Sequence, residues 1–163
     1  MIDIVIITKG KLPYLFNCLE SIKSKTYNTK YHIYIGDTGS TPEELDEMVV
    51  FIKDNFPDQN VSLIKYDYYN FAANNNSIVV SYCKNKYVLF CNNDIKLVDD
   101  CIDKMVEYID THENIGTVGC KLLFEDQSIQ HAGQCLFLNE DGGNLWVSHR
   151  GLRESNLLYN DIE

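Results

Sequence analysis

Residues 87–95 read YVLFCNNDI, an apolar run that ends abruptly in two amides and a carboxylate. A continuous apolar run is typical of a central strand in a parallel α/β sheet, because such a strand is buried on both faces. Open α/β sheets bind their ligands at the carboxyl ends of the strands. Asp94, which follows the run, is therefore a candidate metal ligand, and the rest of the chain is interpreted as its scaffold.

The preceding residues repeat the order of strand, loop and helix three times. The clearest helix start is residues 41–44, TPEE, which supply an N-cap, a proline at the first helical position and a glutamate at the third. One more helix is predicted to start at Asp99 or Asp100. This alternation predicts a mainly parallel sheet with right-handed crossovers and helices on both faces. The predicted strands are residues 2–8, 31–35, 61–66 and 87–91.

The last third of the chain predicts a smaller antiparallel addition. Strands are expected at residues 117–124 and 129–138, and residues 141–143, DGG, look like a hairpin turn before a strand at residues 145–148. From Arg150 onward the pattern becomes polar. With 163 residues the chain is long enough for one full core and too short for two, so a single α/β domain is expected.

The charge of the chain narrows its possible partners. A formal net charge of -10 and a pI near 4.7 argue against nucleic acid or an anionic membrane, since both require clustered Lys and Arg. No signal peptide is apparent, and no apolar run is long enough for an integral membrane segment. An anionic ligand would need a metal ion or local cations to bind here.

The six cysteines form no CxxC pair, so neither a zinc site nor a redox motif is indicated. They are widely spaced, and most lie within apolar runs. Buried, reduced thiols in a cytoplasmic protein are the simplest interpretation.

Two carboxylates, Asp37 and Asp94, follow predicted strands. In a parallel sheet both would point into the crevice at the carboxyl edge, which is the strongest purely physical indication of a site. Each has a structural alternative. Asp37 could form an Asx-turn in its glycine-containing loop, and Asp94 could accept backbone N–H groups within its own loop.

Several segments resemble, in order and spacing, the family 2 glycosyltransferases, which have the GT-A fold. They are residues 4–8 (IVIIT), 14–27 (YLFNCLESIKSKTY), 34–44 (YIGDTGSTPEE), 69–79 (YNFAANNNSIV), 87–97 (YVLFCNNDIKL) and 116–137 (GTVGCKLLFEDQSIQHAGQCLF). Several motifs in register are more specific than any one of them. The resemblance implies one Rossmann-like GT-A domain over residues 1–163. Its nucleotide-binding half would be residues 1–98, and its donor- and acceptor-side half residues 99–163.

The resemblance places Thr8 and Asp37 where the family contacts the base and ribose of the nucleotide sugar. Asn92, Asn93 and Asp94 fall on the DxD-type motif of the family, with Asn92 in place of the first acid. The resemblance therefore implies that Asp94 coordinates Mn2+ or Mg2+, which prefer oxygen ligands, while the two amides line the nucleotide site.

Further residues are candidates for the same site. Asn70 and Asn74 lie where the family reaches the nucleotide and sugar, but an Asn-rich helix cap explains them equally well. His131 and His149 are candidates for a further metal ligand, and His149 is favoured because a ligand from the carboxyl-terminal segment could close the site. A lone histidine more often has a structural role. Candidates to neutralise the diphosphate are Arg150, Arg153 and, less favoured, Lys121, with solvated loop charges as the alternative.

The catalytic base is the main departure from the family pattern. Inverting members usually carry an acidic motif well beyond the QHAG segment at residues 130–133, and this chain stops before that region. Residues 139–141, NED, have a similar local appearance, so Glu140 is nominated as the base with Asp141 beside it in the hairpin turn. Turn and surface roles are the alternative for both acids.

The expected function is metal-dependent transfer of a sugar from a nucleotide-diphosphate sugar, with UDP-sugar favoured, to a glycan or another hydroxyl acceptor. Inversion is expected, with slow donor hydrolysis where water replaces the acceptor. An inactive nucleotide-sugar or glycan binding module is the alternative. A nucleotidyltransferase or a Rossmann dehydrogenase is disfavoured, because residues 9–11, KGK, are not a glycine-rich phosphate loop.

Overall fold

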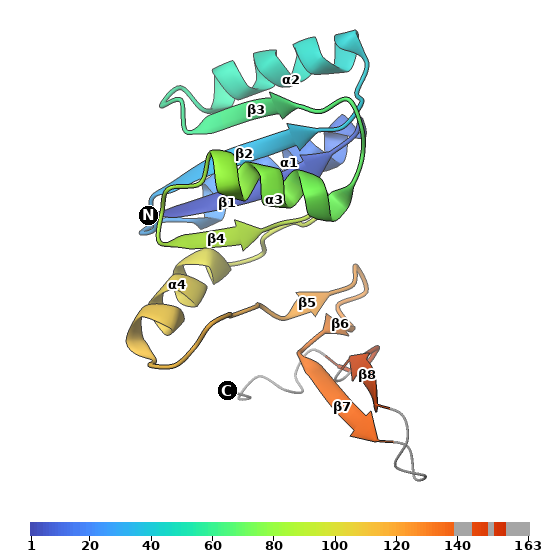
Figure 1. Ribbon diagram of the computed structural model, residues 1–163. Helices are drawn as coiled ribbons and strands as arrows, with labels where there is room; N and C mark the ends of the chain where they lie inside the picture. The colour runs from blue at the N-terminus through green and yellow to red at the C-terminus, as the bar shows by residue number, and fades with distance from the viewer. Residues whose placement is uncertain (139–144, 150–151, 156–163) are drawn as a thin grey trace. The chain divides into compact units, whose positions relative to one another are not determined.

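The computed structural model describes residues 1–138, 145–149 and 152–155. The chain forms two compact units, Met1–Val106 and Glu107–Glu163. The first unit contains a four-stranded parallel sheet, and the second contains two small antiparallel sheets (Figure 1). The expected α/β fold with a small antiparallel addition is therefore confirmed.

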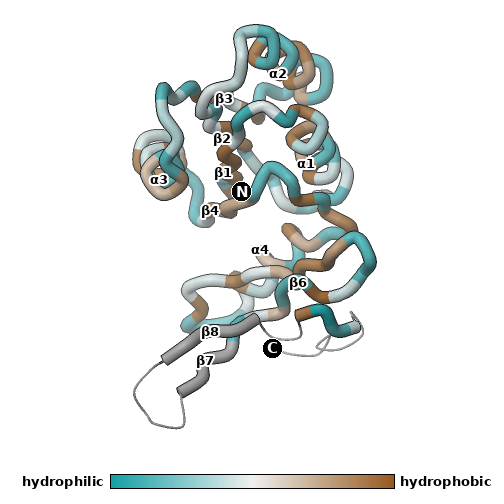
Figure 2. Tube along the Cα trace, turned by 90° about the vertical axis from the view of Figure 1, so that its right-hand side faces the viewer, coloured by the Kyte–Doolittle hydropathy of each residue, from teal (hydrophilic) through white to brown (hydrophobic). Residues whose placement is uncertain are grey.

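Strands and helices alternate through the first unit as predicted. The strand order is β3-β2-β1-β4, so β1 has a neighbour on each side. The prediction that residues 87–91 form a central strand buried on both faces is wrong: β4 (Tyr87–Phe90) lies at the edge of this sheet beside β1, and none of its residues is fully buried. An apolar run indicates packing against a core but does not tell how many strands lie beside it. Figure 2 shows α3 on one side of the strands and α1 and α2 on the other, which confirms that helices cover both faces. The elements are β1 (Ile2–Thr8), α1 (Leu12–Lys25), β2 (Tyr31–Asp37), α2 (Pro42–Asn55), β3 (Val61–Lys65), α3 (Phe71–Ser81), β4 (Tyr87–Phe90) and α4 (Cys101–Thr111). In the part of the chain that the structure describes, no helix has the length and apolar composition needed to cross a membrane.

The main core lies between the sheet and helices α1 and α2. Alternate residues of β1 and β2 face it, because successive side chains of a strand point to opposite faces. Its fully enclosed side chains include Ile4, Ile6, Leu15, Leu19, Ile22, Ile33, Ile35 and Met48. Burying each of these side chains contributes about 2 kcal/mol. This core fixes the strands, and with them the positions of the residues at their ends.

The start of α2 confirms the capping that the sequence predicts. The Thr41 hydroxyl oxygen accepts a hydrogen bond from the Glu44 backbone N–H at 3.2 Å, and the Glu44 carboxylate accepts one from the Thr41 N–H at 2.8 Å. The helix ends at Asn55, two residues before Pro57, because a proline and the residue before it disfavour helical backbone.

Two buried carboxylates attach loops to the first unit. Asp3 accepts hydrogen bonds from two consecutive backbone N–H groups in the loop before β4, both at 2.8 Å. Asp103, in α4, accepts the N–H groups of Tyr27, Asn28 and Thr29 at 2.8, 3.1 and 2.8 Å. Losing such an acceptor leaves part-buried backbone donors unsatisfied, which costs about 1–3 kcal/mol. Both acids therefore have structural roles.

The second unit consists of two antiparallel strand pairs. β5 (Leu122–Leu123) pairs with β6 (Ile129–His131), and β7 (Gln134–Leu138) pairs with β8 (Leu145–His149). The strand predicted at residues 145–148 is β8. The hairpin turn predicted at residues 141–143 lies outside the described residues.

Two predictions of strand extent are wrong. Residues 117–121 form no strand, and only Leu122–Leu123 of the predicted segment pairs with a neighbour. Gly119 within that run weakens any strand, since glycine has no side chain to pack. The strand predicted at residues 129–138 is divided between β6 and β7, because Gly133 has a φ of 96°, outside the range of extended strands.

We expect Asp103→Asn to lower the free energy of unfolding by about 2 kcal/mol at pH 7, because the amide replaces an acceptor oxygen with a donor facing backbone N–H groups. Urea denaturation measures this change. Asp58→Asn, at an exposed turn residue after α2, is the matched control and should change stability by less than about 0.5 kcal/mol. Equal effects of the two substitutions would contradict the role given to Asp103.

The contribution of Asp103 to stability should also depend on pH. Burial alone would raise the pKa of this carboxyl group, but the hydrogen bonds from residues 27–29 outweigh burial and hold the pKa below its ordinary value. Its stabilising effect is therefore complete above the unfolded-state pKa, near 4, and is lost as the pH falls through the folded-state pKa. The difference between wild type and Asp103→Asn should be constant from pH 5 to 8 and shrink at roughly pH 4 and below.

Candidate functional site

The carboxyl ends of β1 and β2 are joined by a set of hydrogen bonds. Thr8 and Asp37 are partners in the register of the two strands. The backbone N–H and the hydroxyl of Thr38 both donate to the Thr8 carbonyl oxygen at 2.9 Å. Beyond the strands, the Gly10 N–H donates to the Ser40 hydroxyl oxygen at 2.8 Å. These bonds fix the loops that follow the two strands against each other.

Asp37 forms the Asx-turn that the sequence suggests as its structural alternative. Its carboxylate accepts hydrogen bonds from the backbone N–H groups of Gly39 at 3.3 Å and Ser40 at 3.2 Å, and from the Ser40 hydroxyl. The side chain has no exposed surface. Ser40, not singled out from the sequence, is therefore part of the site. Its position three residues after an aspartate, in the loop DTGS, is the signal that indicates it.

The end of β4 is attached to the same place. The Cys91 N–H donates to the Val5 carbonyl oxygen at 3.0 Å, extending the ladder between β4 and β1 by one residue. The Asn93 side-chain amide donates to the Thr8 hydroxyl oxygen at 3.0 Å. Asp94, the next residue in this turn, is exposed. Thr8, a buried residue, thus joins the turn that carries Asp94 to the other strand ends.

Helix α3 begins at the same edge and confirms the capping alternative for two asparagines. The Asn70 side-chain oxygen accepts from the Ala73 N–H at 3.0 Å, and the Asn74 side-chain oxygen accepts from the Asn70 N–H at 2.7 Å. Asn74 is fully buried, and neither its amide nitrogen nor the buried Tyr66 hydroxyl has a hydrogen-bond partner in the described part of the chain. Buried polar atoms of this kind commonly bind an ordered water molecule.

The side chains that remain accessible at this edge are few in type. Lys9 is exposed and lies over Gly39, with its Cε and Nζ atoms 3.6 and 3.9 Å from where a Cβ of that glycine would be. Three exposed aromatic side chains lie after β3: Tyr68 and Tyr69 in the loop and Phe71 at the first position of α3, with exposed fractions of 57, 63 and 53%. Neither feature was singled out from the sequence. A ligand at this edge would meet a cation, aromatic rings and the Asp94 carboxylate.

The histidine and arginine candidates belong to the second unit. His131 pairs with Leu122 between β6 and β5, and His149 pairs with Gln134 between β8 and β7. A third candidate, Arg153, contacts an acid and an aromatic ring of the same unit. Its Nη1 atom lies 3.6 Å from an Asp126 carboxylate oxygen, and its guanidinium carbon lies 3.7 Å from the centre of the Phe124 ring.

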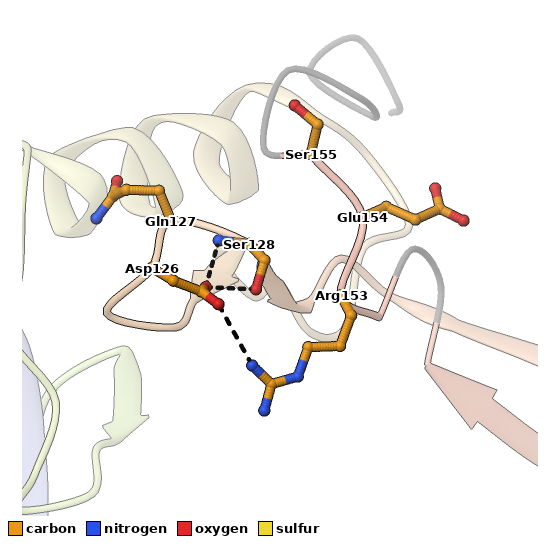
Figure 3. Close-up of a pocket in the computed structure, with 6 residues that line it drawn as sticks. All are labelled: Asp126, Gln127, Ser128, Arg153, Glu154 and Ser155. Atoms are coloured by element: carbon orange, nitrogen blue, oxygen red, sulfur yellow. Dashed lines mark hydrogen bonds and ion pairs between the residues drawn. The ribbon is translucent and has the colours of Figure 1, made fainter.

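A surface cavity of about 300 Å³ is lined by Asp126, Gln127, Ser128, Arg153, Glu154 and Ser155 (Figure 3). Figure 3 shows the Asp126 carboxylate bonded to Ser128 on one side and paired with Arg153 on the other. None of these lining residues is at the ends of the parallel strands. We therefore place the candidate site at the strand ends, where the sequence also predicts it.

Three nominated residues, Glu140, Asp141 and Arg150, lie outside the described residues. Their roles therefore stay predictions. Among the side chains that the structure describes, no three from His, Cys, Asp and Glu gather in one place as a cation site. Asp94 stands as one exposed carboxylate directly after an exposed Asn92 and the anchored Asn93. This donor set fits a hard ion that takes its remaining oxygen ligands from a diphosphate and water.

Comparison with known proteins agrees with the family resemblance found in the sequence. The family model described as "Glycosyl transferase family 2" matches residues 3–133. The chain is 27% identical over 134 residues to the O-antigen biosynthesis protein RfbC of Myxococcus xanthus, a match that covers 81% of this chain and 10% of RfbC.

Two solved structures share the fold at 16% sequence identity. One is the mannosyltransferase PcManGT of Pyrobaculum calidifontis in complex with GDP-Man and Mn2+, with a TM-score of 0.62 over 76% of this chain and 35% of that one. The other is residues 1–349 of TarS of S. aureus in complex with UDP, with a TM-score of 0.57 over 76% of this chain and 39% of that one. The chain thus spans about a tenth of RfbC and between a third and two fifths of these structures.

Ser40→Ala should lower the free energy of unfolding by about 2 kcal/mol, because it removes the acceptor of the Gly10 N–H and a donor to the buried Asp37 carboxylate. Urea denaturation with and without the substitution measures this. Ser24→Ala is the control: this residue is exposed and its hydroxyl makes one long bond of 3.3 Å, so its loss should cost less than about 0.5 kcal/mol. A Ser40→Ala protein as stable as the control would show that the two loops do not depend on this hydroxyl.

Proposed function

Because this chain belongs to glycosyltransferase family 2, we propose that it acts as the core of a glycosyltransferase that moves a sugar from a nucleotide-diphosphate sugar to an acceptor hydroxyl. The observation that carries the proposal is that the ends of three parallel strands are joined at Thr8. This residue is the pairing partner of Asp37 in the sheet and accepts a hydrogen bond from Asn93. This contact holds the Asp94 carboxylate beside the loops of β1 and β2. The proposed domain runs over residues 1–163, with the nucleotide site in residues 1–98.

We place the nucleotide over the loops that follow β1, β2 and β3. The exposed ring faces of Tyr68, Tyr69 and Phe71 suit stacking with a base, and Lys9 supplies a positive charge in a chain with a net charge of -10. Asn70, exposed at the start of α3, is available to the ribose or sugar.

Thr8 and Asp37 would act from beneath the ligand. Both are buried, so any contact of theirs with ribose or base requires a neighbouring loop to shift. A carboxylate can accept about four hydrogen bonds. Asp37 already accepts three, so it can accept about one more from a ligand. Asn74, fully buried, would position α3 rather than contact the donor unless the loop opens.

A divalent ion, Mn2+ or Mg2+, is part of the proposal. Asp94 would hold it together with diphosphate oxygens, and Asn92 would lie beside it. When bound, such an ion stabilises the negative charge that develops on the leaving diphosphate. The complex of PcManGT with GDP-Man and Mn2+ supports this choice. His149 or His131 is proposed as a further ligand and Arg150 as a further cation for the diphosphate.

We assign the acceptor side to residues 99–163. There Glu140 is the proposed base: it would take the proton of an acceptor hydroxyl, whose oxygen attacks the anomeric carbon with inversion. Asp141 would flank it. Water in place of the acceptor would give slow donor hydrolysis. UDP is the preferred nucleotide, and the GDP-Man and UDP complexes of the two fold relatives make both nucleotides reasonable probes.

The state of the cysteines is relevant to the cellular compartment in which the domain works. The cysteines whose side chains the structure describes, Cys18, Cys83, Cys91, Cys101 and Cys120, are all unbridged. Unbridged thiols are typical of reducing compartments, which supports the proposal that the domain works in the cytoplasm.

Asp94→Ala should reduce donor turnover at least about 100-fold, and EDTA should do the same to wild type, since each removes the proposed stabilisation of the leaving group. Release of nucleoside diphosphate from UDP-, GDP- and dTDP-sugars, with Mn2+ or EDTA, measures this. Asp58→Ala, an exposed aspartate after α2, is the matched control and should retain wild-type turnover.

The pattern of results separates the alternatives. Loss of turnover in Glu140→Ala, with calorimetric binding of UDP or GDP unchanged, would support Glu140 as base. Full activity of Asp94→Ala would overturn the metal proposal. Metal-dependent binding without turnover of any donor would favour an inactive nucleotide-sugar binding module.

A further inference from the structure

Two cysteines of the first unit lie next to the turn that carries Asp94. The Sγ atoms of Cys18, in α1, and Cys91, directly after β4, are 3.9 Å apart although 73 positions separate them in sequence. Both thiols also face one backbone oxygen: the Asn92 carbonyl accepts from Cys91 at 3.4 Å and from Cys18 at 3.6 Å. The two S–H groups thus help to hold the first residue of the turn Asn92-Asn93-Asp94.

The two thiols differ in access. Cys18 is fully buried, whereas Cys91 is half-buried, so a small oxidant in solution reaches Cys91 first. A third thiol, Cys83, provides a contrast. Burial, reinforced by the negative charge of Asp3, raises the pKa of Cys83 to about 11, which disfavours its thiolate and hence its oxidation.

We propose that Cys18 and Cys91 are a reversible modification site that forms a disulfide with hydrogen peroxide and thereby changes the turn that carries Asp94. The Cys91 sulfur attacks the peroxide O–O bond, giving a sulfenic acid and releasing one oxygen as water. The Cys18 sulfur then attacks the Cys91 sulfur, forming the S–S bond and releasing the second oxygen as water. Two thiols lose two electrons and two protons in total, and the peroxide is reduced to two waters.

The geometry requires a small movement for this reaction. A disulfide has an S–S distance of about 2.05 Å, so the two sulfurs must approach by roughly 1.9 Å. Rotation of the two side chains supplies part of this distance, and a shift of residue 91 at the end of its strand supplies the rest. Once the disulfide forms, neither sulfur carries a proton.

The Asn92 carbonyl then loses both S–H donors, and the turn that follows loses part of its support. The effect of this change on donor binding rests on the proposed function. The disulfide itself and the change in the turn do not.

Peptide mapping tests the disulfide directly in the full chain. Trypsin releases residues 12–23 with Cys18 and residues 87–96 with Cys91, and each peptide contains one cysteine. After treatment with hydrogen peroxide and alkylation of remaining thiols, we expect these peptides joined, with a mass about 2 Da below their sum, and separated again by dithiothreitol. Residues 66–84, which contain Cys83, should be alkylated as in untreated protein.

Variants and a second measurement make the test decisive. Cys91→Ser and Cys18→Ser should lose the joined peptide, and Cys83→Ser should keep it. Hydrogen exchange of the backbone amides in residues 92–96 should become about threefold faster in oxidised wild type and return to its starting rate after reduction. Both thiols alkylated after peroxide, or Cys91 driven to sulfinic acid without a joined peptide, would overturn the disulfide. A joined peptide with unchanged exchange would overturn its coupling to the turn, whatever the protein's transferase activity.

Discussion

The hydrogen bonds around Thr8 are the constraint on which the rest of the site depends. Its carbonyl oxygen accepts two hydrogen bonds from Thr38, and its hydroxyl oxygen accepts one from the Asn93 amide. The ends of β1, β2 and β4 are therefore joined through one buried residue at the end of β1, which lies between the other two strands. Helices pack on both faces of β1, so Thr8 has a fixed position in the core. The hydrogen bond from Asn93 to Thr8 then fixes the turn that carries the exposed Asp94.

Three buried aspartates in this chain accept hydrogen bonds from backbone N–H groups. Asp3, Asp37 and Asp103 each accept hydrogen bonds from two or more backbone N–H groups of loops. Such bonds to an ionised acceptor are stronger than those between neutral groups, and they satisfy donors that loops would otherwise leave unpaired. The acidic composition thus contributes to loop structure, and only the acids left exposed at the strand ends, such as Asp94, are available to a ligand.

The candidate site accordingly has an inner and an outer layer. Thr8, Asp37 and Asn74 form the inner layer, which holds loops and helix α3 in place. Asn70, Asn92 and Asp94 form the outer layer, together with Lys9 and the exposed aromatic residues Tyr68, Tyr69 and Phe71. An inner layer of this kind can support the outer side chains, because binding groups keep their geometry when packed and hydrogen-bonded residues lie behind them.

The sequence by itself determined the four strand-and-helix units, the capping box at Thr41 and the position of Asp94 directly after the fourth strand, because local periodicity and capping chemistry depend on neighbours in the chain. It did not determine that this strand lies at the edge of the sheet, because the order of strands depends on tertiary packing. Only the tertiary structure decided which polar residues are buried, that Asn93 is bonded to Thr8 and that Cys18 meets Cys91. Those contacts join residues 73 or more positions apart. Such pairings follow from how strands and helices pack, and no local pattern encodes them. The predicted extents of the strands at residues 117–124 and 129–138 were wrong for the same reason, since the length of a strand depends on its pairing partners.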